Sequence, residues 1–591
     1  MTARGIIDIY ISFFEKRGHK QIANSPLVPE NDPTTLFTSS GMQPLVPYLL
    51  GGQHPSGKRL VNVQNCFRAV DIESVGDNRH ETFFRMLGNW SLGDYFKSEE
   101  IPWLWELLTK EFGLPKEKLY ITVFKGTADV PYDQEAFTLW SEVLRNEGMN
   151  PDERIFAADV DKNWWSRSGV PANMPVGEIG GPDTEVYYKF DELEHNKECK
   201  NNPVDCECGK FMEIANSVFI QYKKTEAGFE ELSQKNVDYG GGVERLMAAI
   251  ENTPDVFTTD LFRPIIKIIE DESGKKYEAN KKEMQIIADH LAAAVFITAA
   301  GIKPSNKDQG YVQRRLLRRA LDNFSTLGGE NISAVIKKVV EQYLPTDSEL
   351  EKNFEEIKLT ILEEERNYKV TLHRAKEFIG KKYQGAKEIS AEDAFQLYST
   401  HGLSPTQIRS LGYVFNEQEF AEKMEAHQKL SRSGAEQKFK GGLADHSEKT
   451  IMGHTATHLL HKALRDMFGE ELHQTGSNIT SERVRFDFNF ERKLEDAEVA
   501  EIEKVVNGKI SENLPVHFEI MPLAKAKEIS AIGLFDEKYA EDVKVYFIGD
   551  YSKELCGGPH VTFTSEIKQF KIIKQENIGH GQRRIYSTVG D

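Results

Sequence analysis

The sequence predicts an α+β protein built from several domains. Its 591 residues suffice for three or four domains, each large enough to bury a core of its own. Residues 1–255 alternate short helical stretches with apolar strand-like runs, such as 119–124 and 186–190, between many Gly and Pro turns. Residues 256–437 are almost wholly helical in pattern, whereas 438–591 mix helices and strands again.

The elements follow from local periodicity. Apolar residues recur at helical spacing through 284–299 and through the charged stretch 350–379. Residues 438–445 are typical of a linker, and they precede a predicted helix (450–467), an alternating strand (483–490) and a further helix (494–510). We therefore expect three domains, at 1–255, 256–437 and 438–591.

Composition is that of an ordinary soluble protein, with 28% charged and 39% hydrophobic residues. No run of eighteen apolar residues occurs, and the N-terminus lacks the apolar core of a signal peptide. Five cysteines, an odd number, argue against a secreted disulfide framework. We expect a cytoplasmic protein that does not associate with membranes.

Two pairs of residues near the C-terminus predict a metal site. His454 and His458 are four apart on a predicted helix, so both imidazoles lie on one face, and Cys556 and His560 form a second pair four apart. Three imidazoles and a thiolate can complete a tetrahedral zinc shell. A zinc protease is excluded, because position 455 is Thr where that chemistry needs Glu. The alternative is a satisfied histidine pair and a buried cysteine.

A second metal site is possible in the first domain. His195, Cys199, Cys206 and Cys208 could make a Cys₃His zinc knuckle, although their spacing is irregular. Zinc analysis would distinguish two ions per chain from one.

A net charge of −19 argues against non-specific nucleic-acid binding, but the distribution of charge matters more than the sum. A predicted helix at 310–322 places four arginines on one face, backed by leucines. Such a face could bind a phosphate backbone, or its arginines could be paired with carboxylates. These residues are Arg314, Arg315, Arg318 and Arg319.

Three segments of the first domain could hold a nucleotide. A predicted strand at 62–67 ends at Arg68, a second strand-like run covers 80–90, and the glycine cluster 240–242 leads into a helix that presents Arg245. An arginine fork suits a phosphate, and glycines let a ligand approach the backbone. Neither a P-loop nor a dinucleotide fingerprint occurs.

These segments, together with 25–42, 83–96, 304–315 and the predicted zinc ligands, resemble the motifs of class II alanyl-tRNA synthetases. The resemblance is collinear and covers essentially the whole chain. It implies an antiparallel-sheet catalytic domain, a helical domain that recognises the tRNA acceptor stem, and an α+β zinc editing domain.

The resemblance also implies roles for individual residues. Arg68 would meet the α-phosphate of ATP, Arg245 the γ-phosphate, and Asp238 the ammonium group of the amino acid. The implied ATP-binding residues, with Mg²⁺ on the phosphates, are Arg68, Asp71, Phe84 and Arg245. The implied alanine-binding residues are Trp165, Asn216, Val218, Asp238 and Gly240. For Trp165 and Val218 taken alone, core packing is the simpler reading.

For tRNA(Ala), the resemblance implies that Asn306 reads the minor groove of the acceptor stem beside the arginines at 314–319. An editing site has a physical reason, because a pocket for a methyl group cannot exclude glycine and rejects serine only about 10²-fold. Gln474 lies in the segment that resembles the editing site.

The chain departs from the family pattern at several positions. The loop after the first strand of motif 2 is expected to be short (68–71), Arg85 stands where the family usually has Glu, and Ala215 where it usually has Trp. The acidic residues of the tRNA-reading loop are missing from 397–407, and the small barrel before the editing core is expected to be largely absent. Without the usual C-terminal dimerisation region we expect a monomer.

Two rival functions stay open at this stage. A threonyl-tRNA synthetase shares this type of editing centre but places it before the catalytic domain. A tRNA-binding protein built on a decayed synthetase is suggested only by Arg85 and Ala215. Alanine-dependent exchange of pyrophosphate into ATP would separate them.

Overall fold

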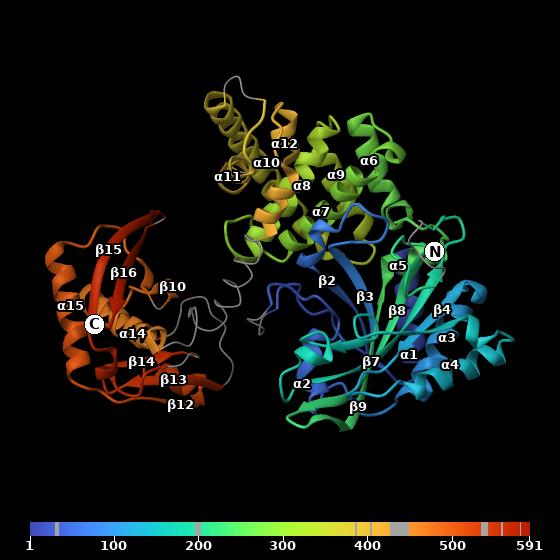
Figure 1. Cartoon of the computed structure of the whole chain (residues 1–591), viewed down its shortest axis with the longest axis horizontal. Helices are drawn as coiled ribbons and strands as arrows, with labels where there is room; N and C mark the ends of the chain where they lie inside the picture. The colour runs from blue at the N-terminus through green and yellow to red at the C-terminus, as the bar shows by residue number, and fades with distance from the viewer. Residues whose placement is uncertain are drawn as a thin grey trace. The chain divides into compact units, whose positions relative to one another are not determined.

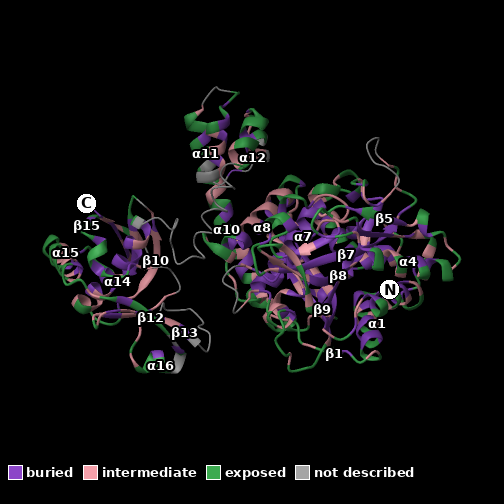
Figure 2. Cartoon of the chain, turned by 60° about the horizontal axis from the view of Figure 1, so that its bottom comes forward, coloured by how far each residue is buried: buried purple, intermediate pink, exposed green. Residues whose placement is uncertain are grey.

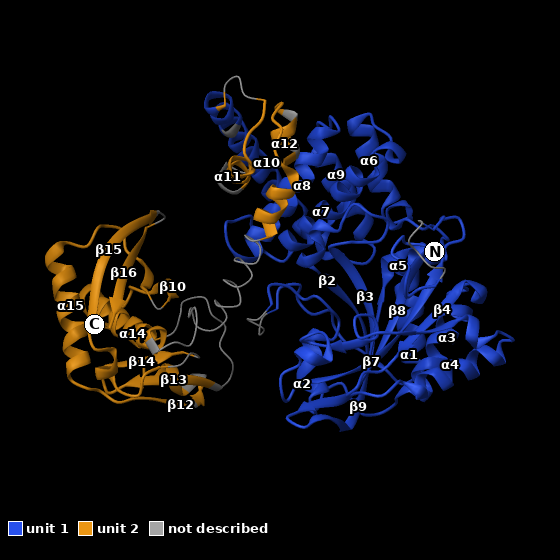
Figure 3. Cartoon of the chain, in the orientation of Figure 1, with its two compact units in different colours: residues 1–29, 35–382 blue, residues 30–34, 383–591 orange. Residues whose placement is uncertain are grey.

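The computed structural model divides the chain into two compact units, which are described separately (Figure 3). The first comprises residues 1–29 and 35–382, and the second lies within 383–591. The predicted boundary at 255/256 falls inside the first unit, and the division into three domains stays a prediction. The structure describes residues 1–29, 35–195, 202–383, 387–401, 403, 405–425, 448–480, 482–532, 542–556, 560–579 and 581–590. The predicted linker 438–445 lies outside these residues.

A nine-stranded sheet organises the first part of unit 1 (Figure 1). Its order is β1-β2-β3-β9-β8-β7-β4-β5, with β6 paired to β7. All neighbouring pairs are antiparallel except β1–β2 and β4–β5. The predicted α+β class and antiparallel catalytic sheet are thus confirmed. The strands are β1 (Lys20–Gln21), β2 (Arg59–Phe67), β3 (Phe83–Leu92), β4 (Leu119–Phe124), β5 (Ile155–Ala158), β6 (Trp164–Ser166), β7 (Ile179–Lys189), β8 (Phe211–Thr225) and β9 (Gly228–Gly242).

Helices bury one face of this sheet. Helix α1 packs against α5 and β2, and α5 also contacts β3, β8 and β9. Apolar side chains of these helices and of the sheet share one core cluster. The other sheet face is therefore the one left for a site. The helices are α1 (Ala3–Glu15), α2 (Val46–Leu49), α3 (Lys97–Glu106), α4 (Gln134–Asn146) and α5 (Val243–Ile250).

Unit 1 continues into a helical part whose centre is α7. Every residue from 284 to 298 is buried, which is typical of a helix surrounded by others (Figure 2). Helices α8, α9 and α10 pack on α7, which also contacts β3. These helices are α6 (Arg263–Ser273), α7 (Lys281–Ala299), α8 (Asp308–Thr326), α9 (Ile332–Tyr343) and α10 (Glu349–Lys382).

In unit 2, helix α14 packs against α15 and contacts strands of two small sheets. One sheet has the order β10-β11-β16-β15 and the other β12-β13-β14. The predicted helices 450–467 and 494–510 and strand 483–490 are confirmed within two residues. The elements are α11 (Ala391–His401), α12 (Pro405–Ser410), α14 (Glu448–Phe468), β10 (Gln474–Ile479), β11 (Val484–Asn489), α15 (Asp496–Ser511), β12 (Val516–Pro522), α16 (Leu523–Glu528), β13 (Asp542–Ile548), β14 (Ser552–Leu555), β15 (Phe570–Gly579) and β16 (Gln582–Val589).

None of the described helices combines the length and the apolar character needed to cross a bilayer.

Candidate functional sites

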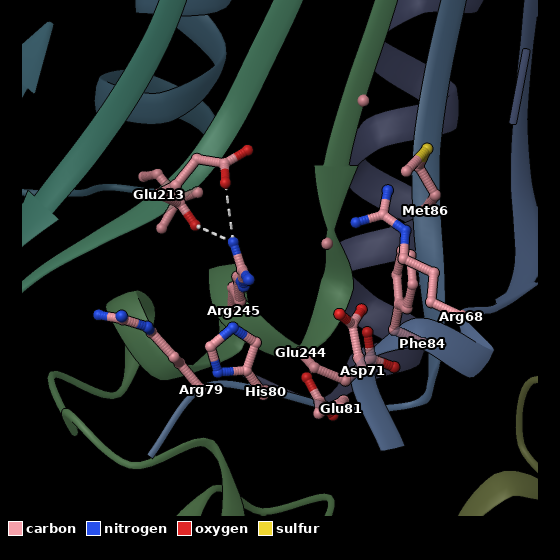
Figure 4. Close-up of a pocket in the computed structure, with 13 residues that line it drawn as sticks. Arg68, Asp71, Arg79, His80, Glu81, Phe84, Met86, Glu213, Glu244 and Arg245 are labelled. Atoms are coloured by element: carbon pink, nitrogen blue, oxygen red, sulfur yellow. Dashed lines mark hydrogen bonds and ion pairs between the residues drawn. The ribbon is translucent and has the colours of Figure 1, made fainter. Parts of the chain in front are cut away.

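A cavity lies over β3, β8 and β9, and two of the predicted arginines face each other across it (Figure 4). Arg68 and Phe84 stand on one side, and Arg245 with Glu213 on the other. The residues that line the cavity are Arg68, Asp71, Arg79, His80, Glu81, Phe84, Met86, Glu213, Ile214, Gly240, Gly242, Glu244 and Arg245. All four predicted ATP-binding residues are therefore brought together.

Arg68 follows β2 directly, and the structure fixes its direction. Its Nε donates to the carbonyl oxygen of Ser39 at 3.2 Å, and its guanidinium lies 4.8 Å from the ring centre of Phe84. The cation–π contact holds the guanidinium over the cavity while leaving its terminal nitrogens for an anion.

Arg245 lies in the first turn of α5, where β9 ends. Its Nη1 is 2.9 Å from Glu213 Oε2, an ion pair that orients the guanidinium. Sequence reasoning missed Glu213. A charged residue between the apolar Met212 and Ile214 of a strand was the signal that could have found it.

The prediction of a short loop (68–71) between the two strands of motif 2 is wrong. Strand β3 begins at Phe83, so the connection spans 68–82 and contains a short 3₁₀ helix, η2 (Ala69–Glu73). This longer segment also supplies Arg79, His80 and Glu81 to the cavity. The strand-like run was expected to begin at position 80, but the chain is still irregular there.

The predicted alanine-binding residues lie on neighbouring strands next to the cavity. Asn216 on β8 is opposite Gly240 on β9, and Val218 is opposite Asp238. Since side chains two apart on a strand share a face, Asp238 lies on the same face as Gly240, which lines the cavity. Trp165 on β6 packs against the apolar cluster that includes Val218.

Asp238 is a buried carboxylate. Its Oδ1 accepts a hydrogen bond of 2.6 Å from Trp90 Nε1, and among the described residues no cation forms an ion pair with it. Burial raises its pKa from 3.8 to about 7, and the bond from Trp90 lowers it only in part. The indole of Trp90 fits here because position 88 is Gly, where a Cβ would lie 2.2 Å from the ring.

Arg85 and Ala215 lie on the opposite face of the sheet. Arg85 Nε is 2.9 Å from Glu244 Oε1, each side chain is 1% exposed, and Arg85 Nη1 donates to Thr346 Oγ1 at 2.8 Å. Ala215 is buried in the core between sheet and helices. Neither residue lines the cavity. These two departures from the family pattern therefore do not change the side chains that line it.

The predicted arginine strip is on α8, but its members are already paired. Arg314 and Arg318 contact Glu364 of α10, at 3.2 and 2.9 Å, and Arg315 and Arg319 contact Glu73 of η2. Pairing with carboxylates, the alternative left open above, is thus what the structure shows. Arg314 also donates to exposed Asn306 Oδ1.

In unit 2 the four predicted metal ligands converge. One donor atom from each of His454, His458, Cys556 and His560 lies within 4.8 Å of the other three. Cys556 Sγ is 3.4 Å from His454 Nε2, and the imidazoles of His454 and His560 stack at 4.2 Å. Helix α14 supplies the first two ligands, and the end of β14 leads into Cys556.

The hydrogen bonds of the two ring nitrogens of His458 and His560 show whether these histidines could bind a metal. His458 Nδ1 pairs with Glu554 Oε2 at 2.6 Å, and His560 Nδ1 lies 3.2 Å from Thr455 Oγ1. The Nε2 atoms of both rings are buried with no hydrogen-bond partner among the described residues. Histidine ligands typically bind a metal through one nitrogen while a carboxylate or hydroxyl fixes the other. The arrangement fits zinc.

The possible second metal site is partly assembled in unit 1. His195, Cys206 and Cys208 lie together, with the two sulfurs 3.3 Å apart and His195 Nδ1 3.6 Å from Cys208. Cys199 lies outside the described residues. Gln474 begins β10, opposite Phe488, and its editing role stays a prediction.

Comparisons with known proteins show the family to which the chain is similar. A family profile described as tRNA synthetases class II (A) matches residues 5–497, and one described as the threonyl and alanyl tRNA synthetase second additional domain matches 543–586. A protein of Treponema denticola named alanine–tRNA ligase is 45% identical over 98% of each chain. Proteins with the same name from Borreliella afzelii and Carboxydothermus hydrogenoformans are 43% and 34% identical. They cover the whole of this chain, and 100% and 80% of their own.

Proposed function

The chain belongs to the alanyl-tRNA synthetases, a family of class II tRNA synthetases, and from this premise we propose how its two units divide the reaction. Unit 1 activates L-alanine with ATP as an alanyl-adenylate and transfers it to tRNA(Ala). Unit 2 hydrolyses seryl- or glycyl-tRNA(Ala).

The observation that carries the first half is the buried carboxylate of Asp238 beside a cavity framed by Arg68 and Arg245. A carboxylate without a cationic partner suits the ammonium group of an amino acid, which would bring the missing charge. Asn216 Oδ1, buried without a hydrogen-bond partner among the described residues, is a further acceptor on that face.

In the proposed activation step, an oxygen of the alanine carboxylate attacks the α-phosphorus of ATP. The bond to the bridging oxygen breaks, and pyrophosphate leaves with its electron pair. Arg68 would stabilise the charge that develops on the α-phosphate, and Arg245, oriented by Glu213, would hold the γ-phosphate. Phe84 would stack on the adenine, Asp71 would complete the ATP-binding set, and Mg²⁺ would neutralise the phosphates.

For tRNA, we propose that exposed Asn306, held next to Arg314, meets the acceptor stem. Arg318 lies one turn from Arg314 and shares its partner, Glu364. Arg315 and Arg319, which were expected to belong to the same surface, contact Glu73.

For editing, we propose that His454, His458, Cys556 and His560 hold Zn²⁺. When bound, zinc supplies Lewis-acid chemistry to an ester carbonyl or to water. Glu554 and Thr455 fix the ring orientation of His458 and His560, and Gln474 belongs to the proposed substrate pocket.

Alanine-dependent exchange of pyrophosphate into ATP tests the proposal for unit 1. We expect exchange with alanine, and much weaker exchange with threonine. Absence of alanine-dependent exchange would refute the adenylate mechanism.

Replacing Cys556 by Ala tests the editing half. Seryl-tRNA(Ala) should accumulate while alanine-dependent exchange continues, because the four proposed ligands of the editing zinc all lie in unit 2. Unchanged deacylation would contradict the role of this cluster. Zinc analysis of the unaltered protein should give two ions per chain if His195, Cys199, Cys206 and Cys208 also bind zinc. In a separate experiment, sedimentation of the protein should show the expected monomer.

A further inference from the structure

The four arginines of α8 divide into two rows with different partners. Residues four apart on a helix lie in one row, so Arg314 and Arg318 form the first row and Arg315 and Arg319 the second. The first row contacts Glu364 in the helical part of unit 1. The second row contacts Glu73, which closes η2 in the connection between β2 and β3. The two rows therefore act on different parts of the molecule.

The second row is directed at the protein. The side chains of Arg315 and Arg319 are 26% and 20% exposed, and each donates to a different oxygen of Glu73. Arginine donors bind an RNA backbone by contacting its phosphate oxygens. Here those donors already have a carboxylate acceptor, which is itself 58% exposed.

The same connection is fixed at its other end by α7. Asp289 accepts hydrogen bonds of 2.7 Å from both the backbone N and Oγ1 of Thr82, the last residue before β3. Next to it, Phe83 stacks on Phe296 with ring centres 3.9 Å apart. Two helices of the helical part thus hold the segment 68–82 at two points.

That segment forms one wall of the proposed ATP cavity, to which it contributes Arg68, Asp71, Arg79, His80 and Glu81. Asp71 is two residues before Glu73 in the single turn η2, where Asp71 N bonds to Arg68 O and Ser74 N to Asp71 O. A shift of Glu73 would therefore move Asp71 and Arg68 with it.

We propose that Arg315 and Arg319 are positioning residues for the ATP site, acting through Glu73, rather than part of the tRNA-binding surface. The inference rests on the proposed ATP cavity. It predicts that these arginines matter in a reaction that contains no tRNA.

The test is alanine-dependent pyrophosphate exchange in the full chain, without tRNA, for Glu73→Gln, Arg315→Gln and Arg319→Gln. We expect each to raise the KM for ATP by about 10-fold, because displaced catalytic groups cost one to two orders of magnitude. The double variant Glu73→Gln with Arg319→Gln should be no worse than Glu73→Gln alone, since Glu73→Gln already breaks the ion pair with Arg319. Glu73→Asp, which keeps the charge, should recover most of the affinity.

The matched control is Lys338→Gln, which breaks the ion pair of Lys338 with Glu341 on α9, away from the cavity. Its KM for ATP should stay unchanged. The thermal midpoint of all variants should match this control, because partly exposed ion pairs contribute little to stability. A lower midpoint with unchanged KM would indicate a merely structural role and overturn the inference.

Two results separate the inference from the proposed function. If Arg315→Gln and Arg319→Gln leave exchange unchanged and raise only the KM for tRNA in aminoacylation, the arginines bind RNA and the inference is wrong. If Arg68→Ala leaves the KM for ATP unchanged, the cavity is not the ATP site, and the proposed function of unit 1 fails together with the inference.

Discussion

Asp238 has a buried carboxyl group, which we propose selects the amino-acid substrate through its ammonium group. Its carboxylate lies in the sheet with only the indole of Trp90 as a close donor, and its pKa is about 7 rather than 3.8. The group is therefore close to half protonated near neutral pH in the free protein. Because only the ionised form attracts an ammonium group, substrate binding and proton release should be coupled.

A pH dependence follows. Since Asp238 ionises as the pH rises through about 7, the affinity for alanine should rise over the same range and fall by about tenfold per unit below it. The KM for alanine in pyrophosphate exchange between pH 5.5 and 8.5 measures this. Asp238→Asn should weaken binding by about 10- to 100-fold, the cost of losing a charged hydrogen bond, and should remove the slope. If the KM for alanine still depends on pH in Asp238→Asn, the titrating group is not Asp238.

Part of the candidate metal site could be predicted from residue types and their spacing. Two histidines four apart on a helix, and a cysteine four before a histidine, are enough to predict a shared metal site, and the structure brings these four together. Glu554, which fixes His458, could not be predicted, because the pair is 96 residues apart and depends on how β14 meets α14. The ion pair of Glu73 with Arg319 spans 246 residues and is a product of the fold in the same way.

At the scale of secondary-structure elements, successive residues of β3 point to opposite faces of the sheet, one towards the cavity and the other towards the packed core. Phe84 and Met86 of β3 line the cavity, whereas Arg85 between them lies on the covered face and pairs with Glu244 of α5. Resemblance marked Arg85 as a departure that could change the pocket. The structure shows instead an ion pair that ties β3 to α5 and, through Thr346, to the chain after α9.

This buried ion pair predicts an asymmetric mutational response. Glu244→Gln leaves the Arg85 guanidinium uncompensated inside the protein, and the free energy of unfolding should fall by about 3–5 kcal/mol. Replacing both residues, Arg85→Met with Glu244→Leu, removes both charges and should cost less than the single change. Chemical denaturation monitored by tryptophan fluorescence measures the difference. A double variant less stable than Glu244→Gln would show that the charges themselves stabilise this fold.

At the scale of the whole molecule, helix and strand content were predictable because long periodic segments dominate the chain. Helices α7, α10, α14 and α15 lie close to the predicted ranges. Less predictable was the compact association of the catalytic sheet with α6–α10 in one unit, since it depends on contacts such as Phe83 with Phe296. The expected absence of the small barrel concerns a stretch that lies partly outside the described residues, at 426–447.

Because each centre draws its side chains from one unit, metal removal should affect the two activities differently. Dialysis against a zinc chelator should abolish hydrolysis of seryl-tRNA(Ala) while alanine-dependent exchange continues. Re-addition of zinc should restore hydrolysis. Simultaneous loss of both activities would imply that zinc also stabilises unit 1, where His195, Cys206 and Cys208 lie together.

If His454, His458, Cys556 and His560 hold the editing zinc as proposed, their confinement to unit 2 has a consequence for cells. A lesion at His454 or Cys556 would not starve translation, because charged product would still be made at its usual rate. It would instead release wrongly charged product into protein synthesis, so that serine or glycine enters at alanine codons throughout the proteome. Such a lesion should therefore behave as a gain of toxicity, which grows worse when serine is abundant and is relieved when alanine is supplied.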